Sequence, residues 1–167
     1  WETIISFIIS QRKSIPAIKS TIEKLCQKFG DKKISQGKVY YTFPSPEVIA
    51  EQSIEDLQGL ALGYRDKYIL STAKSIANGS INLEHVKQMS REEAILELKN
   101  LSGVGEKVAN CVALYGMHKI DAFPIDVWIK RVVDTYYGGS FDTSIYKGYN
   151  GIVQQYMFYY IKNLNKH

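Results

Sequence analysis

A lysine and an aspartate, each placed where a helix should begin, are the side chains of this sequence best suited to covalent chemistry. Lys107 follows a Gly-Val-Gly turn and opens an apolar helical run, so both burial and the positive helix end favour its uncharged amine. An uncharged amine is a nucleophile and forms Schiff bases with masked aldehydes, of which an abasic deoxyribose is one. Asp126 stands at a second helix start, where the helix dipole keeps a carboxylate ionised. Together they form the minimum set for displacing a base from C1′ of a sugar and stabilising the resulting cation.

Each member of this pair also fits an ordinary structural role. A lysine near a helix start is usually solvated, and an aspartate there usually caps the helix. A helix of about three turns followed by a short loop would bring Lys107 and Asp126 together across a cleft. Cys111 lies four residues after Lys107, so both side chains point to the same side of that helix. The combination with the preceding turn favours the chemical interpretation.

The turn itself, Leu101-Ser102-Gly103-Val104-Gly105, has two features of a ligand-binding loop. Two glycines one residue apart let the chain turn tightly and bring bare N–H groups against a ligand. The helix that follows directs its positive end to the same place, which suits an anion, and in a basic chain a nucleic-acid phosphate. An ordinary helix–turn–helix connection, with glycines for close packing, explains the five residues equally well.

Composition sets the outer limits of the interpretation. The 167 residues carry 21 basic and 17 acidic side chains, a net charge of +4, which fits one domain or two small lobes with a nucleic-acid partner. Cys26 and Cys111 are the only cysteines, too few for a four-cysteine iron–sulfur cluster. We expect no membrane association and an intracellular location: cytoplasm or nucleoid in a bacterium, nucleus in a eukaryote. Because Trp1 already lies inside an apolar pattern, we expect a fragment of a longer protein.

Nearly every element that the patterning predicts is helical, so we expect an all-α fold. The sequence Ser90-x-x-Glu93 predicts a capping box that begins the helix leading into the glycine turn, which places a helix–hairpin–helix motif at about 90–117. A short strand at 38–43 would lack a partner. In the last predicted helix, Gln154 and Phe158 share one face. Further predictions are helices over 2–11, 15–29 and 151–164, a helix ending at Gly79, caps at Ser53-x-x-Asp56 and Asp126, and a loop with one helical turn over 138–150.

These residues resemble the helix–hairpin–helix (HhH-GPD) DNA glycosylase superfamily and, within it, the 8-oxoguanine DNA glycosylases. The resemblance implies a two-lobed helical fold with the active site in the cleft between the lobes. It implies one unit over 1–167, with lobe one at about 20–118 and lobe two at about 1–19 plus 119–167. The matching stretches are Glu2–Ser10, Leu62–Tyr68, Leu101–Cys111, Pro124–Trp128 and, more weakly, Gly151-x-x-Gln154-x-x-x-Phe158.

The resemblance also implies an activity, that of a bifunctional DNA glycosylase/AP lyase that excises 8-oxoguanine during base excision repair. Family enzymes flip the damaged base out of double-stranded DNA. Carried over by position, Lys107 would be the nucleophile that forms a Schiff base, and Asp126 its catalytic carboxylate. The strand would then be cut 3′ to the lesion by β-elimination. Cys111 and Phe158 would sandwich the flipped base, and Gln154 would read its Watson–Crick edge.

Other matched positions imply contacts with the DNA duplex. Tyr64 would be the wedge beside the vacated stack, Arg65 a contact to the estranged cytosine, and Gln11 and Arg12 part of the polar cluster that fills the hole. The resemblance implies no required cofactor, although hairpin carbonyls hold a monovalent or other cation in this superfamily. We expect a monomer whose partner is double-stranded DNA containing 8-oxoguanine. The hairpin residues Gly103, Val104 and Gly105 would bind phosphates, and the carbonyls of Leu101 and Gly103 would hold the cation.

The chain departs from the family pattern in four places. Its polar cluster lacks the asparagines of the animal enzymes, and Ala17 stands where those enzymes have another arginine. We therefore expect no strict preference for cytosine opposite the lesion. The N-terminal antiparallel β domain of the family, which tells 8-oxoguanine from guanine, has no counterpart in this sequence. Trp128 replaces a histidine of the animal enzymes.

Two alternative functions stay open at this point. The chain could be a glycosylase for another oxidised or alkylated base, which would use the same lysine and aspartate. It could also be a non-catalytic helix–hairpin–helix module that binds DNA. Such a module needs the glycine turn but neither Lys107 nor Asp126, so their joint presence argues against it.

Overall fold

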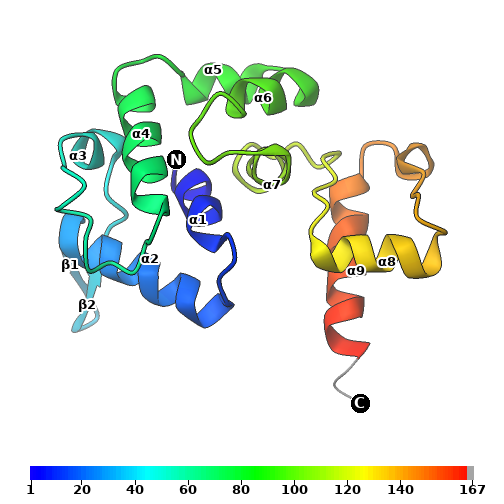
Figure 1. Ribbon diagram of the computed structural model, residues 1–167, viewed down its shortest axis with the longest axis horizontal. Helices are drawn as coiled ribbons and strands as arrows, with labels where there is room; N and C mark the ends of the chain where they lie inside the picture. Colours follow the sequence, from blue (N-terminus) through cyan, green and yellow to red (C-terminus); the bar gives the residue numbers. More distant parts are fainter. Residues whose placement is uncertain (165–167) are drawn as a thin grey trace.

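A computed structural model describes residues 1–164 and places the helices in two groups, with α7 between them (Figure 1). The larger group is formed by the first part of the chain, and α8 and α9 form the smaller one. The last three residues of the predicted second lobe, 165–167, lie outside the described part. In chain order the elements are α1 Glu2–Ser10, α2 Ile15–Phe29, β1 Lys32–Ser35, β2 Lys38–Tyr41, α3 Pro46–Ala50, α4 Arg65–Ala77, α5 Leu83–Gln88, α6 Arg91–Leu98, α7 Glu106–Gly116, α8 Val127–Tyr136, the 3₁₀ turn η1 Thr143–Tyr146, and α9 Asn150–Asn163.

The predicted helix–hairpin–helix motif is confirmed as α6, a turn and α7. Both halves of the capping box are formed, since Ser90 Oγ accepts a hydrogen bond from the Glu93 amide and the Glu93 carboxylate accepts one from the Ser90 amide. Gly105 is the N-cap of α7 and offers no side chain to cap the helix. The first turn of α7 therefore presents backbone N–H groups that no capping side chain satisfies.

The fold is mostly helical, but the prediction that the strand at 38–43 lacks a partner was wrong. Residues Lys38–Tyr41 pair antiparallel with Lys32–Ser35. The connection is a two-residue turn of Gln36 and Gly37, both with positive φ, at 49° and 74°. Two positive φ values are the mark of a type I′ hairpin turn, which usually contains Asn-Gly. Glutamine at the first position concealed the hairpin in the sequence.

Two other local predictions differ from the structure. The side chains of Ser53 and Asp56 do exchange the hydrogen bonds of a cap, yet the chain continues there only as turns and no helix follows. Helix α5 was not expected, although Asn82 caps it by accepting a hydrogen bond from the His85 amide. Six residues are too few for a clear apolar periodicity, so only tertiary packing reveals such a helix.

Two apolar cores account for the two groups of helices. The larger core includes side chains from α1 through α7, and the smaller one is formed by α8 and α9 around Ile129 and Met157. Residues 1–19 were expected to join the lobe formed by 119–167, but the packing differs. The apolar stripe of α1 is fully buried in the larger core, against α2, α4 and α7.

Helix α7 belongs to both groups. Its first half packs in the larger core, and its last turns meet the segment that leads to α8 through Ala113, Leu114 and Ala122. Gly151 closes this junction, because its amide donates to the Ile120 carbonyl at 2.8 Å. A side chain there would collide with Leu114. Within residues 1–164, no helix combines the length and apolarity needed to cross a membrane.

Replacing Gly103 with alanine should destabilise the hairpin strongly. Gly103 has φ +78°, and an added Cβ would lie 2.8 Å from atoms of the Tyr68 side chain. We expect the free energy of unfolding to fall by about 1–3 kcal/mol or more, measured by urea denaturation. Gly105→Ala is the matched control: its φ is −88° and nothing lies within 4 Å of the added methyl group, so we expect a loss of only about 0.5–1 kcal/mol. Equal losses for the two variants would contradict this account.

Candidate active site

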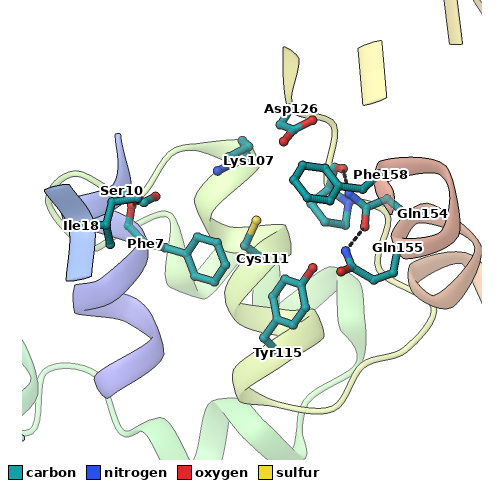
Figure 2. A pocket seen from close by; sticks show the side chains of 11 residues that line it. Phe7, Ser10, Ile18, Lys107, Cys111, Tyr115, Asp126, Gln154, Gln155 and Phe158 are labelled. Atoms are coloured by element: carbon teal, nitrogen blue, oxygen red, sulfur yellow. Dashed lines mark hydrogen bonds between the residues drawn. The ribbon is translucent and has the colours of Figure 1, made fainter. Parts of the chain in front are cut away.

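A pocket of about 320 Å³ lies between the two groups of helices and contains the predicted catalytic pair (Figure 2). This volume suits a single small ligand or base. The pocket is lined from three sides, by α7, by the ends of α1 and α2, and by the segment 124–126 with α9. It brings together all five residues predicted to be catalytic or to contact a base. Its lining residues are Phe7, Ser10, Ile18, Lys107, Cys111, Tyr115, Pro124, Asp126, Gln154, Gln155 and Phe158.

Lys107 stands in the first turn of α7 with its side chain partly buried. Its ammonium nitrogen lies 5.3 Å from the centroid of the Phe7 ring. Among residues 1–164 it forms no ion pair, so no carboxylate neutralises it. The aromatic ring holds the amine in the pocket through a cation–π contact without consuming it in a salt bridge. This leaves the nitrogen accessible to a ligand.

Asp126 is fixed by a helix cap, as predicted. One carboxylate oxygen, Oδ1, accepts hydrogen bonds from the backbone amides of Trp128 and Ile129, both at 2.9 Å. This double cap orients the carboxylate at the start of α8. Asp126 lines the pocket together with Lys107, and Oδ2 takes no part in the cap. The residue is therefore both a structural cap and a charge facing the pocket.

Cys111 and Tyr115 follow Lys107 at successive turns of α7, so the three side chains share one face (Figure 2). Burial raises the pKa of the Cys111 thiol to about 11, with Lys107 opposing the shift and Asp126 adding to it. Burial likewise raises the pKa of Tyr115 to about 12. The part of this wall that Cys111 and Tyr115 form is accordingly uncharged at neutral pH. A neutral wall can pack against the face of a planar ring.

Helix α9 supplies the opposite wall through Gln154, Gln155 and Phe158 (Figure 2). Gln154 is buried, and its amide nitrogen donates to the Pro124 carbonyl at 3.0 Å. Its side-chain oxygen accepts a hydrogen bond from Gln155. A ligand read by Gln154 would have to replace one of these protein partners. Phe158 faces the pocket from the α9 side, across from Cys111.

A second pocket, of about 670 Å³, adjoins the first and shares Ser10, Lys107 and Asp126 with it. The predicted DNA-contacting residues Gln11 and Arg12 line it. Arg12 is exposed, with φ +53°, a left-handed conformation that is costly for a residue with a side chain. Such strained residues gather at functional sites. The other lining residues are Lys13, Ile125, Val127, Trp128 and Lys130.

Gln11 joins the end of α1 to the hairpin. Its side-chain amide donates to the Gly103 carbonyl at 2.9 Å, and its own carbonyl accepts a hydrogen bond from the Arg65 guanidinium. The Leu101 carbonyl accepts the Val104 amide at 3.1 Å. Each of the two carbonyls predicted to hold a cation accepts one hydrogen bond, and a carbonyl oxygen has a second lone pair, so the cation site stays a prediction. Among the described residues, no three His, Cys, Asp or Glu side chains gather where they could hold a metal ion.

Two further residues predicted to contact the duplex, Tyr64 and Arg65, differ in exposure. The Tyr64 side chain is half exposed at the start of α4. Arg65 is only 6% exposed, and its guanidinium donates to the carbonyls of Leu62 and Gln11 while stacking 4.5 Å from the Tyr64 ring centroid. Arg65 would have to leave these partners to reach a base. Its contact to an estranged cytosine stays a prediction, and its role in this structure is to join three segments.

Six lining residues were not predicted from the sequence. Phe7 and Tyr115 stack with ring centroids 5.6 Å apart, but each belongs to an apolar helical pattern that reads as core. The spacing 107, 111, 115 along one helix face would have pointed to Tyr115. The remaining four come from segments whose meeting depends on tertiary packing. They are Ser10, Ile18, Pro124 and Gln155.

A family model of base excision DNA repair proteins of the HhH-GPD superfamily matches residues 5–146. The chain belongs to this superfamily. It is 35% identical over 158 residues to a Methanothermobacter thermautotrophicus protein named "Probable N-glycosylase/DNA lyase", covering 83% of this chain and 50% of that protein. The predicted membership and the mostly helical HhH-GPD fold are thereby confirmed.

Two solved structures of superfamily members are close to this one. The structure of MBOgg1 with a low-affinity DNA ligand superposes with a TM-score of 0.93 at 39% identity, covering 99% of this chain and 60% of that chain. The Clostridium acetobutylicum 8-oxoguanine glycosylase/lyase, solved with double-stranded DNA that has cytosine opposite 8-oxoguanine, gives a TM-score of 0.91 at 36% identity, covering 98% and 60%. This chain thus spans between half and three-fifths of the length of these relatives.

The raised pKa of Cys111 predicts a thiol that resists alkylation at neutral pH. In a Cys26→Ser background, we expect iodoacetamide to modify Cys111 slowly at pH 8 and increasingly as the pH approaches 11, because the thiolate is the reactive form. Mass spectrometry measures the modified fraction. The same protein unfolded in urea should react readily near pH 9.0, the ordinary pKa of a cysteine thiol. Rapid modification of the folded protein at pH 8 would contradict the neutral pocket wall.

Proposed function

We propose that this chain is the catalytic part of a bifunctional DNA glycosylase/AP lyase that excises 8-oxoguanine. The observation that carries the proposal is that Lys107 and Asp126 line one base-sized pocket, between Cys111 on one side and Phe158 on the other. The naming of three relatives as glycosylase/lyase or Ogg1 proteins supports the same conclusion. A DNA-binding module without catalysis would have no use for an unneutralised amine and a capped carboxylate in a shared pocket.

In the proposed reaction the flipped base lies between Cys111 and Phe158, and the sugar lies at Lys107. Lys107 first gives up one proton, and its uncharged amine then attacks C1′ as the bond between C1′ and the base breaks. The base leaves with the electron pair and takes up the proton that Lys107 released. Asp126 stabilises the positive charge that develops on the sugar. The amine loses its proton as the sugar ring opens, which leaves a Schiff base. Loss of a C2′ proton then expels the 3′ phosphate by β-elimination.

The proposed substrate contacts outside the pocket use the hairpin and the polar turn. The uncapped first turn of α7 would bind a phosphate through its N–H groups, and Gly105 leaves that approach open because nothing lies near its missing side chain. The half-exposed Tyr64 would wedge into the vacated stack. The strained Arg12 would reach into the gap left by the flipped base.

Borohydride reduction tests the mechanism. With duplex DNA containing 8-oxoguanine, we expect the wild type to be trapped covalently on the DNA, because borohydride reduces the Schiff base. Lys107→Gln should give no trapped complex and lower the excision rate by about 10³-fold or more. Asp126→Asn should lower it by about 10²–10³-fold, since it removes the charge that stabilises the sugar cation. Gel electrophoresis measures the trapped fraction.

A lysine outside the pocket controls for the loss of charge. The substitution Lys74→Gln removes an exposed lysine of α4. We expect this variant to be trapped on the DNA to the same extent as the wild type. Absence of trapping with the wild type, or trapping of Lys107→Gln at the wild-type level, would refute the lysine mechanism. Normal DNA binding by an inactive wild type would favour the non-catalytic module instead.

A panel of lesion duplexes tests the substrate. We expect excision of 8-oxoguanine to exceed that of thymine glycol and 3-methyladenine, because a neutral thiol and an aromatic ring suit a planar purine without fixed charge. Single-turnover rates measure the difference, with each normal base placed opposite 8-oxoguanine in turn. Excision of thymine glycol or 3-methyladenine but not of 8-oxoguanine would assign the chain to another glycosylase specificity.

A further inference from the structure

A cation–aromatic cluster of Arg131, Trp128 and Lys162 lies beside the pocket and has no part in the reaction proposed above. The guanidinium carbon of Arg131 lies 5.3 Å from the Trp128 ring centroid, and the ammonium of Lys162 lies 4.7 Å from it. Lys162 also lies 5.8 Å from the centroid of the Phe158 ring, one helical turn earlier in α9. The cluster thus joins α8 to α9 and contains two positive charges.

Neither cation of the cluster is neutralised. Within residues 1–164, neither Arg131 nor Lys162 forms an ion pair, and the nearby Asp134 pairs with Lys130 at 2.9 Å. A salt bridge would orient a cation but cancel its charge, whereas an aromatic ring orients it and leaves the charge available. Two cations that are oriented by aromatic rings and have no ion-pair partner can bind an anionic ligand.

The cluster lies next to the place where the reacting sugar would be. Trp128 lines the second pocket together with Lys107 and Asp126, and Phe158 lines the first. The Trp128 backbone amide also donates to the Asp126 carboxylate. The residue whose ring contacts both cations is therefore hydrogen-bonded to the carboxylate that faces the pocket. A sugar held at Lys107 brings a phosphate on each side of it. The chemistry that matches two free cations there is a DNA phosphate.

We infer that Arg131 and Lys162, oriented by Trp128, bind a backbone phosphate of the lesion-containing strand next to the flipped nucleotide. The inference rests on the proposed function, because it requires DNA to cross the pocket mouth. It assigns the α8–α9 face a binding role of its own, separate from the hairpin and from the polar turn. Binding there would anchor the strand on the side of the pocket opposite α7.

The salt dependence of DNA binding tests this inference. The probe is a duplex with a tetrahydrofuran abasic analogue, and fluorescence anisotropy measures the dissociation constant at several salt concentrations. Each lost phosphate contact should lower the slope of log affinity against log salt by about 0.9. Because both cations bind the same phosphate, we expect the double variant Arg131→Gln/Lys162→Gln to lose about 0.9 in total and each single variant to lose part of it. Wild-type slopes in all three variants would overturn the inference, even if affinity fell.

The chain offers a matched control. The ammonium of Lys28 lies 5.2 Å from the Phe29 ring centroid, in the same kind of cation–π contact, but at the far end of α2 beside the β-hairpin. Lys28→Gln should keep the wild-type slope, because no phosphate is expected there. A loss in this control equal to that of Lys162→Gln would show a general charge effect and reject a defined site.

The probe separates failure of this inference from failure of the proposed function. The analogue has no base to excise and no aldehyde to form a Schiff base, so only binding is measured. Partial unfolding of a variant lowers its active fraction but leaves the slope unchanged, and so does not imitate the expected result. A wild type that does not bind the duplex would reject the proposed function and this inference together. Salt-dependent wild-type binding with unaltered variant slopes would reject this inference alone.

Discussion

The sharing of helix α7 between two cores is the constraint on which the site depends. Its apolar residues are buried against α1 and α6 within the larger core, and its last turns pack against the segment leading to α8. A helix held at both ends cannot move independently of either group. The face that bears Lys107, Cys111 and Tyr115 is therefore fixed in the gap between the groups. The pocket lies between the two groups, with this face of α7 forming one of its walls.

Polar groups around the pocket are held mainly by backbone atoms or aromatic rings. The Asp126 carboxylate accepts hydrogen bonds from two backbone amides, and the Gln154 side-chain amide donates one to the Pro124 carbonyl. The Lys107 ammonium lies over the Phe7 ring. Backbone partners and rings orient a side chain without cancelling its charge, as a salt bridge would. The site thus keeps one positive and one negative group in a partly buried pocket, which is where electrostatic effects on a reaction are strongest.

The segment from Tyr64 to the hairpin forms a second connected unit. Tyr64 stacks on Arg65, whose guanidinium donates to the Gln11 carbonyl, and the Gln11 amide donates to the Gly103 carbonyl. A side chain at the expected DNA surface is in this way linked to the turn that precedes Lys107. The network explains why an arginine is buried at this point, since its donors satisfy carbonyls at the ends of irregular segments.

The sequence by itself determined the local structure and the identity of the chemical groups. Some local features depend only on neighbours within a few residues, so the sequence pattern predicts them. They are the capping box at Ser90, the cap at Asp126 and the glycine turn before Lys107. The β-hairpin was not predicted, because glutamine is unusual at the first position of its Gln36-Gly37 turn. Only the tertiary structure decided that α1 packs in the larger core, that Gln11 and Arg65 bind backbone rather than solvent, and that Phe7 supports Lys107. Those arrangements depend on which apolar faces bury the most surface together, a property of all the helices at once that no single stretch of residues contains.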